Sequence, residues 1–135
     1  MENKNTMQAF FGEQVYSYTR KQAIEDGILN DVTSMAQEAG IKFPVAITIA
    51  VWNEYVKPCD ELNSYGQSCE GRLWDILYMF RHNALKNASD LMYFELYFQM
   101  MKNGKPVEEL VKLKAHIGPG DQGEPVITIM KPDED

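Results

Sequence analysis

The second half of the chain shows the clearest alternation of apolar and polar residues. Residues 91–101 read LMYFELYFQMM, and every second side chain from Phe94 to Met100 is apolar. A two-residue period is typical of a β-strand with one buried face. Residues 110–118 repeat this period, and the β-branched segment 126–130 follows a Gly- and Pro-rich connection. Because turn residues separate the segments, we predict three antiparallel strands in a meander.

Residues 71–88 contain the clearest helical pattern. Their apolar residues recur at intervals of three and four, which places them on one face of an α-helix. The expected core-facing residues are Leu73, Ile76, Leu77, Phe80 and Ala84. We expect Phe80 to be buried where this helix meets the apolar side of the sheet.

Two short helices are predicted before residue 41. Thr19 is followed three residues later by a glutamine, which is the spacing of a capping box. Gly27 suits the left-handed residue that ends such a helix. A second helix, with Asn30 or Asp31 as its cap, should end at Gly40 in the same way.

Residues 45–56 carry two conflicting signals. Their β-branched side chains favour a strand, whereas apolar residues at positions i, i+4, i+7 and i+11 and the flanking prolines favour a helix. We predict a helix. The polar residues 57–70 that follow show no periodicity and predict a long loop.

The order of these elements predicts an α+β fold in a single domain spanning residues 1–135. Helices that precede strands are typical of helices packed on an antiparallel sheet. We therefore expect N-terminal helices packed on a C-terminal three-stranded antiparallel meander. A chain of 135 residues buries roughly two thirds of its unfolded surface, so it needs neither a disulfide nor a metal to fold.

The acidic composition narrows the classes of partner. Thirteen basic residues against twenty acidic ones give a net charge of −7. Nucleic acids and anionic membranes attract clusters of Lys and Arg, so we expect binding to neither. No signal-peptide core or membrane-spanning apolar run is present, and two cysteines do not form a disulfide framework. The sequence predicts a cytoplasmic protein with reduced thiols.

The sequence contains no recognisable catalytic motif. It lacks a G-x-S-x-G elbow, an H-E-x-x-H helix and a Walker phosphate loop. Cys59, Cys69, His82 and His116 are too scattered for a zinc site, whose ligands are usually paired at short spacing. We therefore expect no metal and no cofactor, and binding rather than catalysis.

Nine residues are candidates for a binding site. Arg20 is expected in the first turn of a helix, where the dipole disfavours a cation, so an ion pair or an anion site would account for it. The connection at residues 118–125 could either stiffen a hairpin or present carboxylates to a partner. The candidates are Tyr18, Arg20, Trp52, Arg72, Asp75, Arg81, His82, Asp121 and Glu124.

The polar side of the predicted sheet interleaves tyrosines with lysines. Tyr93 and Tyr97 could stack nucleic-acid bases, as exposed aromatic residues do in some sheets. Cross-strand pairing of Glu95 with Lys112 or Lys114 explains the same residues structurally. The net charge of the chain favours the structural explanation.

Several segments carry a family resemblance. They are YTRKQAIEDG, Trp52, LWD and the closing LKAHIGPGDQGEPVITIMKPDED. From Tyr16 onward the chain resembles a family of small uncharacterised bacterial proteins that are carried by phages, plasmids and conjugative elements. The resemblance implies this genomic setting and implies no catalytic residue.

We predict an accessory protein of a mobile element that binds a protein partner and is not an enzyme. The alternative is a small enzyme or binder acting on a nucleotide or nucleic acid. A cleft shared by His82 and the arginines would favour the alternative, whereas an exposed apolar or acidic patch would favour the protein partner.

We predict no measurable retention of single- or double-stranded DNA at physiological salt. Binding to phosphates needs clustered cations, and only Lys112 and Lys114 fall on one face at neighbouring strand positions. A mobility-shift assay across salt concentrations measures this. A salt-dependent complex that is abolished by Lys112→Glu with Lys114→Glu would overturn the protein-partner prediction.

Overall fold

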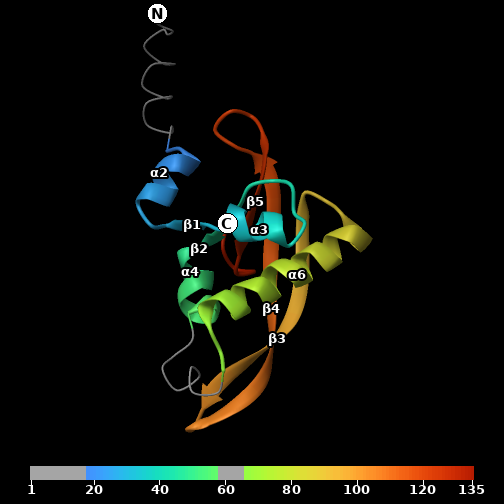
Figure 1. Cartoon of the computed structure of the whole chain (residues 1–135). Helices are drawn as coiled ribbons and strands as arrows, with labels where there is room; N and C mark the ends of the chain where they lie inside the picture. The colour runs from blue at the N-terminus through green and yellow to red at the C-terminus, as the bar shows by residue number, and fades with distance from the viewer. Residues whose placement is uncertain (1–17, 58–65) are drawn as a thin grey trace, which may run out of the picture.

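A five-stranded mixed sheet organises the chain, in the order β1-β2-β5-β4-β3 (Figure 1). The computed structural model describes residues 18–57 and 66–135. The strands are β1 (Leu29–Asp31), β2 (Val45–Thr48), β3 (Leu91–Lys102), β4 (Lys105–Pro119) and β5 (Pro125–Met130). The helices are α2 (Arg20–Glu25), α3 (Thr33–Glu38), α4 (Ile49–Val51), the π-helical η1 (Trp52–Val56) and α6 (Cys69–Asn87).

The predicted α+β class and the antiparallel meander β3–β4–β5 are confirmed. β3 pairs along its full length with residues 105–116 of β4, with Phe94 opposite Leu113. Asn103 and Gly104 join them with φ angles of 52° and 75°, which is the backbone of a tight type I′ hairpin turn. The end of this hairpin extends beyond the other elements (Figure 1).

The predicted helix at residues 45–56 is wrong for its first four residues, which form β2. This strand pairs parallel with β5 and antiparallel with β1, so it enlarges the meander to five strands. Val45, Ala46 and Ile47 are all buried, because both faces of the strand are covered and no polar alternation is needed. Residues 49–56 are helical, as α4 and η1.

The predicted cap of the second helix also needs correction. Asn30 and Asp31 lie in β1, and Val32 is the cap residue, without a side-chain cap bond. The Asp31 carboxylate instead accepts from the backbone N–H and the hydroxyl of Thr33, two residues later. The remaining boundaries are confirmed: Thr19 forms the capping box, and two glycines with positive φ follow the helices.

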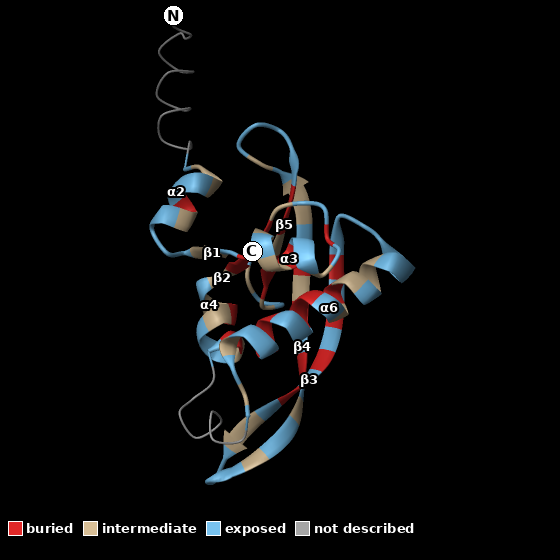
Figure 2. Ribbon diagram, viewed as in Figure 1, coloured by how far each residue is buried: buried red, intermediate tan, exposed pale blue. Residues whose placement is uncertain are grey.

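The long helix α6 covers one face of the sheet, which we call the inner face. The rings of Phe80 and Phe94 meet edge to face at 5.9 Å, and Leu77 is fully buried. Ser68 caps the helix, so the predicted loop ends two residues early; its residues 58–65 lie outside the described part of the chain. Figure 2 shows buried and exposed residues alternating along β3.

Phe80→Ala should lower the free energy of unfolding by about 3–5 kcal/mol, because it leaves a cavity between α6 and the sheet. Urea denaturation followed by circular dichroism measures this change. Leu85→Ala on the same helix is the matched control: Leu85 is 70% exposed, so we expect a change within about 0.5 kcal/mol. Similar losses in the two variants would mean that Phe80 is not part of the core.

Candidate functional site

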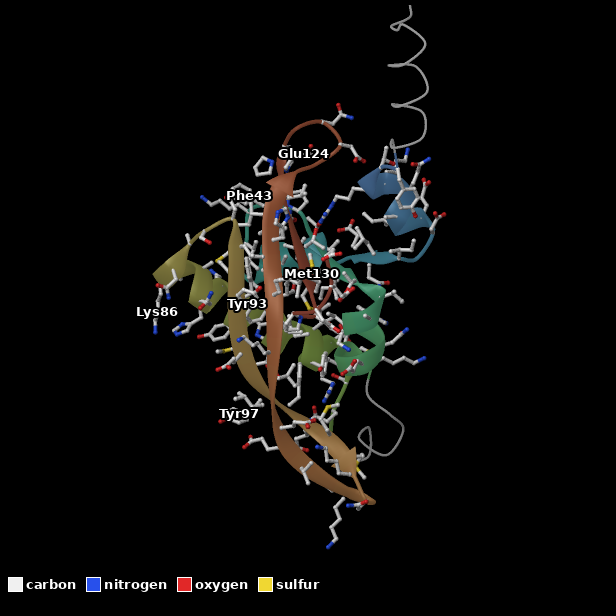
Figure 3. All side chains as sticks on the ribbon, turned by 180° about the vertical axis from the view of Figure 1, so that it is seen from behind. Phe43, Lys86, Tyr93, Tyr97, Glu124 and Met130 are labelled. Atoms are coloured by element: carbon white, nitrogen blue, oxygen red, sulfur yellow. The ribbon has the colours of Figure 1, made fainter. Side chains whose placement is uncertain are left out.

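Four large apolar side chains gather on the face of the β3–β4 hairpin opposite α6, the outer face. Leu91, Tyr93 and Tyr97 come from β3, and Leu110 of β4 lies directly opposite Tyr97. They are 46–61% exposed, and Figure 3 shows the two tyrosines along the outer side of β3. Their register is fixed because the alternate β3 side chains are buried against α6. We call these four residues the outer patch.

The half of the outer face at β5 is covered. At β5, α2 is attached through Arg20, which donates to the Thr128 hydroxyl. The C-terminal tail crosses the same face, where Glu134 accepts from the Thr48 hydroxyl through its carboxylate and from Lys114 through its backbone carbonyl. The outer-face side chains Val126 and Met130 of β5 are accordingly buried. The outer patch therefore lies on the other half of this face, at β3 and β4, which the described residues leave largely open.

A groove of about 450 Å³ adjoins the outer patch at the edge of the sheet, between α6 and β3. It is lined by Asp75, Tyr78 and Met79 of α6, Glu95, Leu96 and Tyr97 of β3, and Leu110 of β4. Each wall contributes a carboxylate and a tyrosine. Among the described residues, neither Asp75 nor Glu95 forms a salt bridge. Partial burial raises the pKa of Asp75, which marks it as a poorly hydrated acid.

Arg20 has a structural role. Its guanidinium donates to the Thr128 hydroxyl and to the Ile127 carbonyl, each at 2.7 Å. Asp121 accepts from the backbone N–H groups of Arg20 and Lys21, at 2.9 and 3.0 Å, and these bonds lower the pKa of Asp121. Burial lowers the pKa of Arg20. Together these bonds join α2 to β5 and to the turn that precedes β5. They explain why an arginine lies in the first turn of a helix.

Tyr18 and Glu124 also make local bonds. The Tyr18 hydroxyl donates to the Asp26 carboxylate at 2.7 Å, which raises the pKa of this tyrosine. Glu124 accepts from the backbone N–H of Gln122 at 2.8 Å, and its carboxylate lies against Gly120. Tyr18 thus joins the two ends of α2. Glu124 stabilises its own turn and lines, with Arg20 and Asp121, a groove of about 430 Å³.

Arg72 is almost completely buried, with 2% of its surface exposed. Its guanidinium donates to the carbonyl oxygens of Tyr55 at 2.5 Å and Gln99 at 3.0 Å, and to the Gln67 side chain at 3.0 Å. It also lies 4.4 Å from the centre of the Phe98 ring. The residue thus joins η1, α6 and β3 inside the protein, where a ligand does not reach it.

The other basic candidates lie apart from one another. Arg81 lines a second, largely apolar groove of about 450 Å³ that includes Phe43 and Leu85, whereas His82 is exposed. Trp52 is half-buried against the core. The structure does not bring His82 and the three arginines into one cleft. Of the nine candidates, Asp75 is the one that lines the groove beside the outer patch.

Leu91, Tyr78, Met79 and Leu110 were not among the sequence candidates. One sequence signal could have identified them. A large apolar residue at a position where the strand or helix period predicts solvent exposure, such as Leu110, indicates a surface that binds another molecule.

The described residues contain no group of three or more His, Cys, Asp or Glu positioned to hold a metal ion. Cys69 begins α6 and His116 is exposed on β4, while Cys59 lies outside the described residues. Within 18–57 and 66–135, no helix is long and apolar enough to cross a membrane.

The fold and its open patch define an α+β protein with a partly uncovered sheet face. The chain belongs to DUF6573, a family of unknown function whose model matches residues 7–135. No curated protein and no solved structure matches it. Membership of an uncharacterised family is thus confirmed, and the mobile-element setting stays a prediction.

Arg72→Leu should lower the free energy of unfolding by about 2–6 kcal/mol, because the partly buried carbonyls of Tyr55 and Gln99 lose their donor at about 1–3 kcal/mol each. Urea denaturation measures the loss. Arg81→Leu is the matched control, and as a partly exposed residue it should change stability by no more than about 0.5 kcal/mol. A fully stable Arg72→Leu protein would show that these carbonyls do not need the guanidinium.

Proposed function

We propose that this protein is a non-enzymatic accessory protein of a mobile element and acts by binding a protein partner through the outer patch. The observation that carries the proposal is the contrast between the two halves of one sheet face. Helix α2 and the tail cover the half at β5, whereas Tyr93, Tyr97 and two leucines remain exposed on the other half. An exposed apolar patch with a polar rim is characteristic of an interaction site, and tyrosine is enriched among residues that dominate binding energy.

The lysines on this face support a protein partner over nucleic acid. Lys112 lies over the Tyr93 ring at 5.3 Å, and Lys114 donates to the Glu134 carbonyl. Both are therefore already engaged within the chain, and the patch sits on a protein of net charge −7. Phosphate recognition needs several available cations.

The resemblance to proteins of phages, plasmids and conjugative elements supports the setting. The alternative of a nucleotide-directed enzyme or binder depends on a common cleft for basic residues, and the separation of Arg20, Arg72 and Arg81 gives it no support. An acidic protein with an apolar patch fits an accessory role in which the protein docks on another.

Tyr97→Thr and Leu110→Thr should each weaken partner binding at least about tenfold, since central aromatic and apolar contacts contribute 1.4 kcal/mol or more. Threonine keeps the strand preference of both positions. The protein is immobilised and used to isolate partners from a bacterial lysate, and each variant is then titrated against the purified partner.

Leu85→Thr is the matched control, because it removes an equally large and still more exposed leucine from α6. It should leave the affinity unchanged. A partner that binds both patch variants as tightly as it binds the original protein would show that the outer patch is not the contact surface.

A further inference from the structure

Strand β3 forms one edge of the sheet, and its hydrogen-bonding pattern shows which groups face outward. Asp90, just before the strand, accepts from Ile117 of β4, whereas the Gln99 carbonyl points away from β4 and accepts from Arg72. Because neighbouring residues alternate in an antiparallel pair, the odd-numbered residues of β3 direct their backbone N–H and C=O groups to the open side. These groups are a template for another strand.

Side chains bond to the outward backbone groups at two points of this edge. The Ser89 hydroxyl bonds to the backbone N–H and carbonyl of Leu91, and Arg72 donates to the carbonyl of Gln99, three residues before β3 ends. Between them, the outward groups of Glu95 and Tyr97 border the groove between α6 and β3, and those of Tyr93 continue the same edge. The open part of the edge therefore has defined limits and adjoins the outer patch.

The side chains along this open edge are of the kinds that attract positively charged residues. Glu95 stands between Tyr93 and Tyr97 on the outer face, and Asp75 faces the same groove from α6. Carboxylates attract Lys and Arg, and tyrosine rings bind the same cations through their faces. Lys112 already makes such a contact with Tyr93.

We propose that the partner contributes an extended segment that adds as a sixth strand to the edge of β3, with Lys or Arg alternating with apolar residues. The inference rests on the proposed function, since the strand would occupy the edge beside the outer patch. Backbone pairing supplies the affinity in this mode, and alternate side chains supply the specificity. A second copy of this chain fits poorly, because it would bring its own Glu95 and Asp75 into the same groove.

The probe is a capped nonapeptide of alternating valine and arginine, titrated by nuclear magnetic resonance. Two further peptides carry N-methyl groups on either the valine or the arginine nitrogens. A peptide strand paired with β3 directs the backbone N–H groups of either its valines or its arginines toward β3, but not both. Methylation of the set that faces β3 should weaken binding at least about tenfold, whereas methylation of the other set should leave the affinity unchanged. Amide exchange at Tyr93, Glu95 and Tyr97 should slow at least about tenfold on binding.

Charge selection is tested separately. A peptide of alternating valine and glutamate should not bind, and Asp75→Asn with Glu95→Gln should weaken binding of the arginine peptide at least about tenfold. Glu108→Gln is the matched control, because Glu108 is an exposed acid on β4 that does not line the groove.

Equal binding of both methylated peptides, or no binding of any peptide, would overturn strand addition. So would slowed exchange at residues 93–97 that grows with protein concentration without peptide, which would indicate pairing between two copies. Equal affinity for the arginine and glutamate peptides would overturn charge selection. The proposed function is judged independently, by the effect of Tyr97→Thr and Leu110→Thr on the captured partner.

Discussion

A buried guanidinium, that of Arg72, joins three elements of this fold: η1, α6 and β3. Removing Arg72 from water is unfavourable unless its N–H groups are bonded, so its bonds to Tyr55 and Gln99 specify how η1 and β3 sit around the start of α6. The Phe80–Phe94 contact then fixes the helix farther along. Because Arg72 also bonds to the β3 edge at Gln99, the core and the candidate site depend on the same side chain.

The elements that can be predicted from the sequence are those with one solvent-exposed face and one buried face. The alternation in β3 and the helical spacing in α6 both arise from a boundary between core and solvent, so strand, helix and buried face could all be derived from pattern. Strand β2 has no such boundary, since Val45, Ala46 and Ile47 are buried together. Strand β1 has only three residues, too few to establish a period.

The candidate site was less predictable, because polar side chains take their roles from partners that are distant in the chain. Arg20 bonds to Thr128, 108 positions away, and no local pattern contains that information. Exposure was easier to predict: Tyr93 and Tyr97 follow from the strand period alone. Asp75 was a candidate from the sequence, but its position opposite Glu95 depends on how α6 crosses β3.

The order of strands in the sheet has a consequence for synthesis. Strand β5 occupies the centre of the sheet and joins β2 to β4, yet it follows the other four strands in the chain. While the protein is being made, β3 and β4 can pair as a hairpin, but β2 has no strand that pairs it to β4 until β5 has emerged. The two halves of the sheet can therefore be joined only after β5 has been synthesised. Long-range pairing of this kind is slow to form.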